Sequence, residues 1–169
     1  VYAADRVVAR LLADGDDVGV CALGIGTSDV TVPVSSAGRD QPWVPPGSDD
    51  ATRTRLDAVF DAPVAATDTA TTQTDRLPTD LRERLSTRAD IVVVTPALDS
   101  ETAEVAMSLS TVGHHVSVVS PDVTDRRRPG KTVAHVERQL RLTRLRGAGA
   151  TVFDWDTRRS LAAAMEVAR

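Results

Sequence analysis

Apolar residues in the first third of the chain recur at two periods, which predict a helix followed by strands. Positions 4–12 place apolar residues on one face at helical spacing, and Gly15 follows them. Residues 18–23 form a short apolar run that predicts a buried strand. Residues 30–34 alternate around Pro33, which indicates an edge strand, and the two strands are predicted to form an antiparallel hairpin. Residues 35–50, rich in Pro, Gly and Ser, are predicted to be loop.

The middle of the chain predicts two helices separated by an irregular stretch. Residues 51–60 indicate a short helix with Leu56, Val59 and Phe60 inward. Residues 61–75 have no period and are predicted to be loop. Beyond them, one helix is indicated by leucines four residues apart and by a proline that its first turn tolerates: Leu77, Pro78, Leu81 and Leu85.

The second half alternates strands with helices. Strands are predicted at 91–95, 115–120 and 150–153. The first crossover helix carries apolar residues up to Gly113, with Asp99 or Ser100 as its cap. The second crossover helix and the C-terminal helix (157–168) are expected to place these residues inward: Val133, Val136, Leu140, Leu145, Leu161 and Met165.

This order of elements predicts an α/β fold with a Rossmann-like, mostly parallel sheet and helices on both faces. Ligands of such sheets bind beyond the carboxyl ends of the strands. A ligand site is therefore expected in the loops that follow the strands, at 24–29, 96–100, 120–130 and 154–156.

The composition of the chain argues against some classes of function. The chain has 169 residues, 41% of them hydrophobic, and a net charge of −4, which argues against a general nucleic-acid binder. Aromatic residues make up only 3%, so Val, Leu and Ala must fill the core. The single cysteine, Cys21, excludes an internal disulfide, lies in a predicted strand as a core residue, and favours a cytoplasmic setting.

The familiar catalytic motifs are incomplete. Gly24-Ile25-Gly26 lacks the third glycine of a dinucleotide fingerprint, because position 29 is Asp29. Gly130-Lys131-Thr132 lacks the first glycine of a phosphate loop. The basic run 126–128 is interpreted as a solvated loop, with an anion or partner site as the alternative. The three histidines, His114, His115 and His135, are interpreted as structural or exposed, and no Gly-x-Ser-x-Gly elbow is present.

Several segments, taken in order, carry a family resemblance. Residues 1–8, the Gly-Asp-Asp-Val-Gly passage at 15–19, residues 90–99 and residues 113–121 resemble the DUF-58 family in its archaeal form. That resemblance implies a single von Willebrand factor A-like domain over residues 1–169. It further implies that the first strand and a membrane anchor lie upstream of Val1, and that the full-length protein is tethered to the cytoplasmic face of the membrane.

The resemblance also implies a metal-ion-dependent adhesion site that holds Mg²⁺ through oxygen ligands. The Asp-x-Ser-x-Ser motif is absent from this chain, and Pro96 stands at the usual aspartate position. Asp99 and Thr67 are the metal-ligand candidates, with Thr72 and Thr74 as alternatives for the threonine. A helix-capping role is favoured for Asp99, and a degenerate site without metal is at least as well supported as a working one.

The function expected from the resemblance is a non-enzymatic protein-binding module. Complete members of the family work beside MoxR-type AAA+ ATPases in assembling or maturing protein complexes, so such an ATPase is the expected partner. The alternative is a Rossmann-type nucleotide or small-molecule-binding enzyme. A receiver-like regulatory domain is a weaker third hypothesis, because its acidic pair and lysine at the strand ends are not evident.

Overall fold

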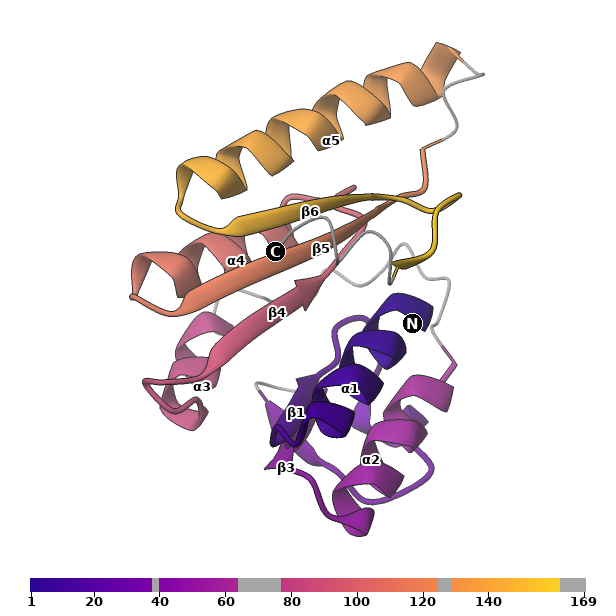
Figure 1. The fold of residues 1–169 in the computed structure, drawn as a ribbon, viewed down its shortest axis with the longest axis vertical. Helices are drawn as coiled ribbons and strands as arrows, with labels where there is room; N and C mark the ends of the chain where they lie inside the picture. Colours follow the sequence, from indigo (N-terminus) through magenta and orange to yellow (C-terminus); the bar gives the residue numbers. More distant parts are fainter. Residues whose placement is uncertain (38–39, 64–76, 125–128, 162–169) are drawn as a thin grey trace. The chain divides into compact units, whose positions relative to one another are not determined.

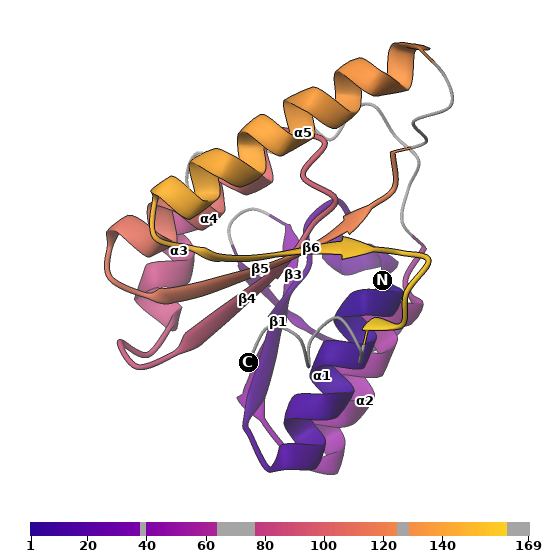
Figure 2. The same ribbon diagram turned by 45° about the horizontal axis from the view of Figure 1, so that its top comes forward.

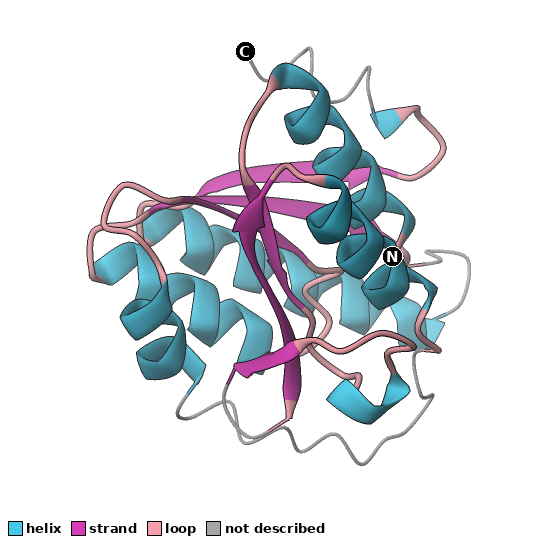
Figure 3. Ribbon diagram, turned by 90° about the horizontal axis from the view of Figure 1, so that it is seen from below, coloured by secondary structure: helices cyan, strands magenta, loops and turns pink. Residues whose placement is uncertain are grey.

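The structure is a computed structural model that describes residues 1–37, 40–63, 77–124 and 129–161 (Figures 1 and 3). The chain divides into two compact units, Val1–Glu83 and Arg84–Arg169. Each unit has its own three-stranded sheet. The two units are described separately below.

The first unit contains helices on an antiparallel sheet. Its elements are α1 (Tyr2–Asp14), β1 (Val18–Cys21), the short 3-10 helix η1 (Thr27–Asp29), β2 (Ser35–Ala37), β3 (Gln41–Gly47) and α2 (Asp50–Asp61), with α3 (Leu77–Arg84) at the unit's boundary. Helix α1 ends where Gly15 adopts a φ of 94°, a left-handed conformation that favours glycine. Helix α2 begins at Asp49, whose carboxylate accepts a hydrogen bond from Thr52 N at 2.6 Å.

The predicted hairpin partner of the first strand was wrong. Strand β1 pairs antiparallel with β3, inside the segment expected to be loop, whereas residues 30–34 form no strand. The prolines of β3 suggested a loop, but Pro45 and Pro46 fall where the register between the strands shifts, which is a position that tolerates proline. Residues 41–47 form a strand because burial of their side chains stabilises it: Trp43 is 6% exposed and Val44 is fully buried.

The core of the first unit is aliphatic, as the low aromatic content requires. Its buried residues come from α1, β1, β3, α2 and the segment after η1: Val8, Val18, Val30, Val44, Leu56, Ala58, Val59 and Ala62. Val32 and Val34 pack against this cluster without joining the sheet. The period-two pattern at 30–34 therefore arises from burial on one side of an irregular segment and not from strand pairing.

The second unit contains the parallel sheet that the alternating pattern predicts. Its elements are β4 (Asp90–Val94), α4 (Glu101–Thr111), β5 (His115–Asp122), α5 (Pro129–Gly147) and β6 (Thr151–Asp156). The strands lie in the order β4-β5-β6, and both pairings are parallel. Residues 154–156, expected to be loop, extend β6 because they continue its pairing with β5.

Helices α4 and α5 pack together on one face of this sheet (Figures 1 and 2). Two successive right-handed crossovers in the same direction require this arrangement. The alternate β5 residues Val116, Val118 and Ser120 are buried. The mixed α/β class and the parallel sheet flanked by helices are thus confirmed, and the arrangement is compatible with a Rossmann-like fold. Helices were expected on both faces, but the described crossover helices α4 and α5 share one face, because both crossovers run in the same direction.

The orientation expected for α5 was wrong at three positions. Val133, Val136 and Leu140 are 59%, 53% and 55% exposed, whereas Leu142 and Leu145 are fully buried. Helix α5 carries two apolar stripes on opposite sides, and the inward one also contains Arg138. Within the described residues, no helix combines the length and hydropathy that crossing a membrane requires.

The two leucines of α5 offer a matched test of this orientation. We expect Leu142→Ala to lower the free energy of unfolding by about 3 kcal/mol, because it leaves a cavity between α5 and the sheet. Leu140→Ala removes the same atoms from an exposed site, so its effect should stay within about 0.5 kcal/mol. Urea denaturation of both variants in dilute solution measures the difference, and equal losses would contradict the orientation.

Candidate functional site

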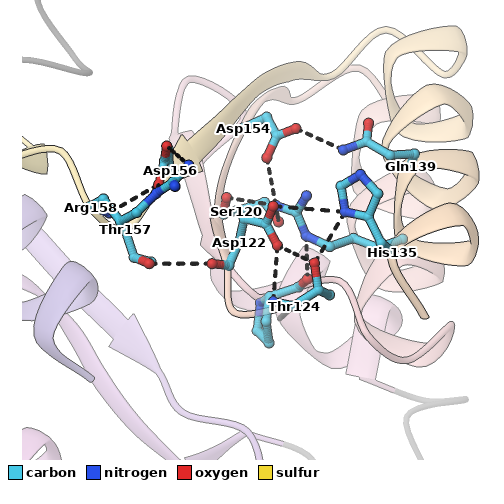
Figure 4. Close-up of polar contacts among 11 residues, drawn as sticks. Ser120, Asp122, Thr124, His135, Gln139, Asp154, Asp156, Thr157 and Arg158 are labelled. Atoms are coloured by element: carbon cyan, nitrogen blue, oxygen red, sulfur yellow. Dashed lines mark hydrogen bonds and ion pairs between the residues drawn. The ribbon is translucent and has the colours of Figure 1, made fainter. Parts of the chain in front are cut away.

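The carboxyl ends of β4, β5 and β6 meet at one edge of the parallel sheet, where α/β domains bind their ligands (Figure 4). Polar side chains from this edge and from α5 form a strand-end cluster, which we define by its members: Ser120, Asp122, Thr124, His135, Arg138, Gln139 and Asp154. Three of the four segments singled out from the sequence, 96–100, 120–130 and 154–156, contribute to this edge.

Arg138 joins the ends of all three strands. Its side chain is fully buried. The Nε atom donates to the Pro96 carbonyl oxygen at 3.0 Å, after β4. The Nη2 atom donates to the carbonyl and Oγ of Ser120 on β5, both at 2.9 Å, and to Asp154 Oδ1 on β6 at 2.7 Å. The planar guanidinium presents several donors in fixed directions, which lysine cannot match.

The loop after β4 is held in a strained conformation by α5. Ala97 has a φ of 55°, although it has a Cβ atom, and it is fully buried. Its N–H donates to Thr95 Oγ1 at 3.1 Å. Its carbonyl accepts a longer hydrogen bond, 3.4 Å, from Arg141 Nη1. Two arginines of α5 thus fix the segment that leaves β4.

Asp154 is the counterion of Arg138. Its side chain is 32% exposed, and Gln139 Nε2 donates to its second oxygen at 3.0 Å. Partial burial raises the pKa of Asp154, but the hydrogen bonds from Arg138 and Gln139 outweigh it, so the net pKa is lowered. The resulting stabilisation is complete above the ordinary pKa near 3.8 and is lost as pH falls through the lowered value.

Asp122, Thr124 and His135 form a second polar array at the end of β5 (Figure 4). The backbone N–H and the hydroxyl of Thr124 both donate to Asp122 Oδ1. The hydroxyl proton is thereby engaged, so His135 Nδ1 must donate to Thr124 Oγ1, 3.1 Å away. This assignment leaves Nε2 of a neutral His135 as an acceptor.

The outer rim of the edge carries exposed charge. Arg158 pairs with Asp156 at 2.7 Å, and its side chain is 87% exposed. The hydrogen bond from the Arg158 side chain lowers the pKa of Asp156 to about 2. Thr157 Oγ1 donates to the Asp122 carbonyl oxygen at 3.3 Å, which links this turn to β5.

Of the metal-ligand candidates, only Asp99 lies in the part of the chain that the structure describes. Asp99 Oδ1 accepts from Thr102 N at 3.0 Å, so this residue caps α4, the role that the sequence favoured. Thr67, Thr72 and Thr74 lie outside the described residues. Where the structure describes the chain, no group of three or more His, Cys, Asp or Glu side chains could hold a metal ion.

The other candidates from the sequence lie away from the strand-end cluster or outside the described residues. His115 is exposed and contacts Asp90 at the opposite end of the parallel sheet, with 3.2 Å between Nδ1 and Oδ1. Cys21 is a half-buried thiol on β1. The Gly24–Gly26 segment leads into η1 and not into the α-helix that a dinucleotide site requires. Residues 126–128 are outside the described ranges.

Arg138, the residue that organises this edge, was not among the site residues predicted from the sequence. A signal was present, because Arg138, Leu142 and Leu145 share the spacing of one helix face. The second apolar stripe on the same helix, formed by Val133, Val136 and Leu140, was taken as the inward face instead. His135 was interpreted as structural or exposed; its side chain is mostly buried, and its partners come from the end of β5 and the loop after it, which spacing alone could not bring close.

Comparisons with known proteins return no match to any family model, curated protein or solved structure.

Replacing Arg138 tests its structural role. We expect Arg138→Ala to cost about 3 kcal/mol of unfolding free energy, because Asp154 loses its counterion and the carbonyls of Pro96 and Ser120 lose their donor. The exposed Arg146, on the same helix, provides a control, and Arg146→Ala should change stability by about 0.5 kcal/mol or less. Urea denaturation at neutral pH compares them, and a neutral Arg138→Ala would refute the role.

Proposed function

We propose that the chain is a von Willebrand factor A-like, non-enzymatic protein-binding module of DUF-58 type, and that its partner is a MoxR-type AAA+ ATPase acting in the assembly or maturation of protein complexes. The order of helices and strands supports the fold part of this proposal. The resemblance of residues 1–8, 14–20, 90–99 and 113–121 supports the partner.

The observation that carries the proposal is the burial of Arg138 at the strand ends. In a metal-ion-dependent adhesion site, oxygen ligands at this edge would face a divalent cation. Here the Pro96 carbonyl, Ser120 and Asp154 already receive hydrogen bonds from a fully buried guanidinium. A second cation among these oxygens would be repelled by a fixed positive charge at low dielectric. A degenerate, metal-free edge that binds protein through its rim fits this arrangement best.

The Asp122–Thr124–His135 array favours a second candidate, a Rossmann-type nucleotide or small-molecule-binding enzyme. A histidine held by a threonine hydroxyl beside a carboxylate is a common arrangement for a general base. The incomplete phosphate-loop and dinucleotide motifs weigh against this alternative.

Thermal unfolding separates these candidates. We expect millimolar Mg²⁺ to leave the Tm of the wild-type chain unchanged relative to a control with EDTA, because a ligand that does not bind the folded state cannot stabilise it. ATP and NAD should likewise have no effect. A Mg²⁺-dependent rise in Tm would contradict the degenerate site, and a nucleotide-dependent rise that His135→Ala abolishes would favour the enzyme.

Binding to the ATPase tests the partner directly. We expect the wild-type chain to bind an immobilised MoxR-type ATPase from the same genome, and the double variant Asp156→Ala with Arg158→Ala to associate more slowly by about fivefold, since exposed rim charges govern association rates. The exposed Arg10–Asp14 pair of α1, at 2.9 Å, supplies a matched control. Arg10→Ala with Asp14→Ala should bind like wild type. Absence of wild-type binding, or equal effects of both double variants, would contradict the proposal.

A further inference from the structure

The outer face of α5 carries an apolar stripe that the described residues of the second unit do not cover. Val133, Val136 and Leu140 are each more than half exposed. By helical spacing they lie on the side of α5 opposite the buried Leu142 and Leu145. Their spacing of three and then four residues is that of the a and d positions of a coiled coil. The next a and d positions are Thr143 and Gly147, so the apolar part of the stripe consists of Val133, Val136 and Leu140.

The charges beside the stripe are arranged for self-recognition. Glu137 and Arg144 follow Val136 and Thr143 respectively, so both occupy the e position of consecutive heptads. They lie on the same side of the stripe, about 10 Å apart along the helix axis. Glu137 has a side chain that is 57% exposed, with a 3.6 Å ion pair to Arg141, and Arg144 is exposed.

An antiparallel pair of identical helices brings e positions together across the interface. Consider two α5 helices related by a two-fold axis that crosses each helix halfway between Glu137 and Arg144. Each Glu137 then faces the Arg144 of the other copy. Two such ion pairs form at once, and the apolar stripes meet beside them. A parallel pairing would not bring Glu137 opposite Arg144, because each e position then faces the g position of the preceding heptad, which places Glu137 opposite Thr132 and Arg144 opposite Gln139.

We propose that the exposed stripe of α5 is a self-association surface, and that its occupant is the α5 helix of a second copy of this chain in antiparallel orientation. This inference is independent of the proposed function. The stripe is short compared with stable interfaces, which bury about 800 Å² on each partner. The association is therefore weak, with a Kd of about 10 μM to 1 mM.

Exchanging the charges at positions 137 and 144 tests the proposed self-association. Sedimentation equilibrium of the whole chain, at concentrations up to about 1 mM, measures it. Wild type should show a concentration-dependent rise in average mass that weakens with added salt. Glu137→Arg alone places Arg opposite Arg, and Arg144→Glu alone places Glu opposite Glu, so each single variant should raise the Kd by about tenfold. An equimolar mixture of the two variants should associate again, because every Arg then meets a Glu of the other variant.

Matched lysine substitutions test the apolar part of the surface. Leu140→Lys should abolish association, whereas Val112→Lys, at the 43% exposed C-cap of α4, should not alter it. Circular dichroism of each variant establishes that it is folded. A wild-type chain that stays monomeric over the whole concentration range would overturn the proposal, and so would single variants whose mixture fails to associate.

Discussion

The second unit depends on one buried cation. The Arg138 guanidinium donates hydrogen bonds to the Pro96 carbonyl after β4, to Ser120 on β5 and to Asp154 on β6, so one side chain ties all three strands together. Burying a charge is costly unless it is paired and its donors are used. Asp154 supplies the charge, and the carbonyls of Pro96 and Ser120 supply most of the remaining acceptors. Of the Arg138 nitrogens, Nη1 lacks a hydrogen-bond partner among the described residues.

This interaction also limits what the edge of the sheet can do. Oxygen atoms that would otherwise attract a metal or a phosphate-binding water network are committed to Arg138. The strained Ala97 and the arginines that hold it make the loop after β4 a fixed part of the surface. Among the described residues at this edge, the Asp122–Thr124–His135 array and the Asp156–Arg158 rim carry polar side chains that Arg138 does not contact. The fixed shape of the edge supports the proposed binding surface.

The same helix faces two environments. One side of α5 inserts Arg138, Leu142 and Leu145 toward the sheet and α4, and the other side presents Val133, Val136 and Leu140 outward. An exposed apolar stripe on a helix that is already packed carries a cost in solubility, which natural surfaces normally avoid. Self-association through complementary Glu137 and Arg144 side chains explains why both apolar faces occur on one helix.

The sequence by itself determined the alternation of strands and helices in the second unit, because β-branched runs such as residues 91–94 and helix ends such as Gly113 act locally. It also indicated the capping role of Asp99 and the edge of the sheet where the polar residues meet.

Tertiary structure alone decided three matters. Strand β3 forms despite its prolines because Trp43 and Val44 are buried there. Helix α5 turns its shorter apolar stripe inward because the strand ends offer acceptors to Arg138. His135 reaches Asp122 and Thr124 because parallel packing brings distant segments together. Each of these outcomes depends on contacts between residues far apart in the chain, which local periodicity does not encode.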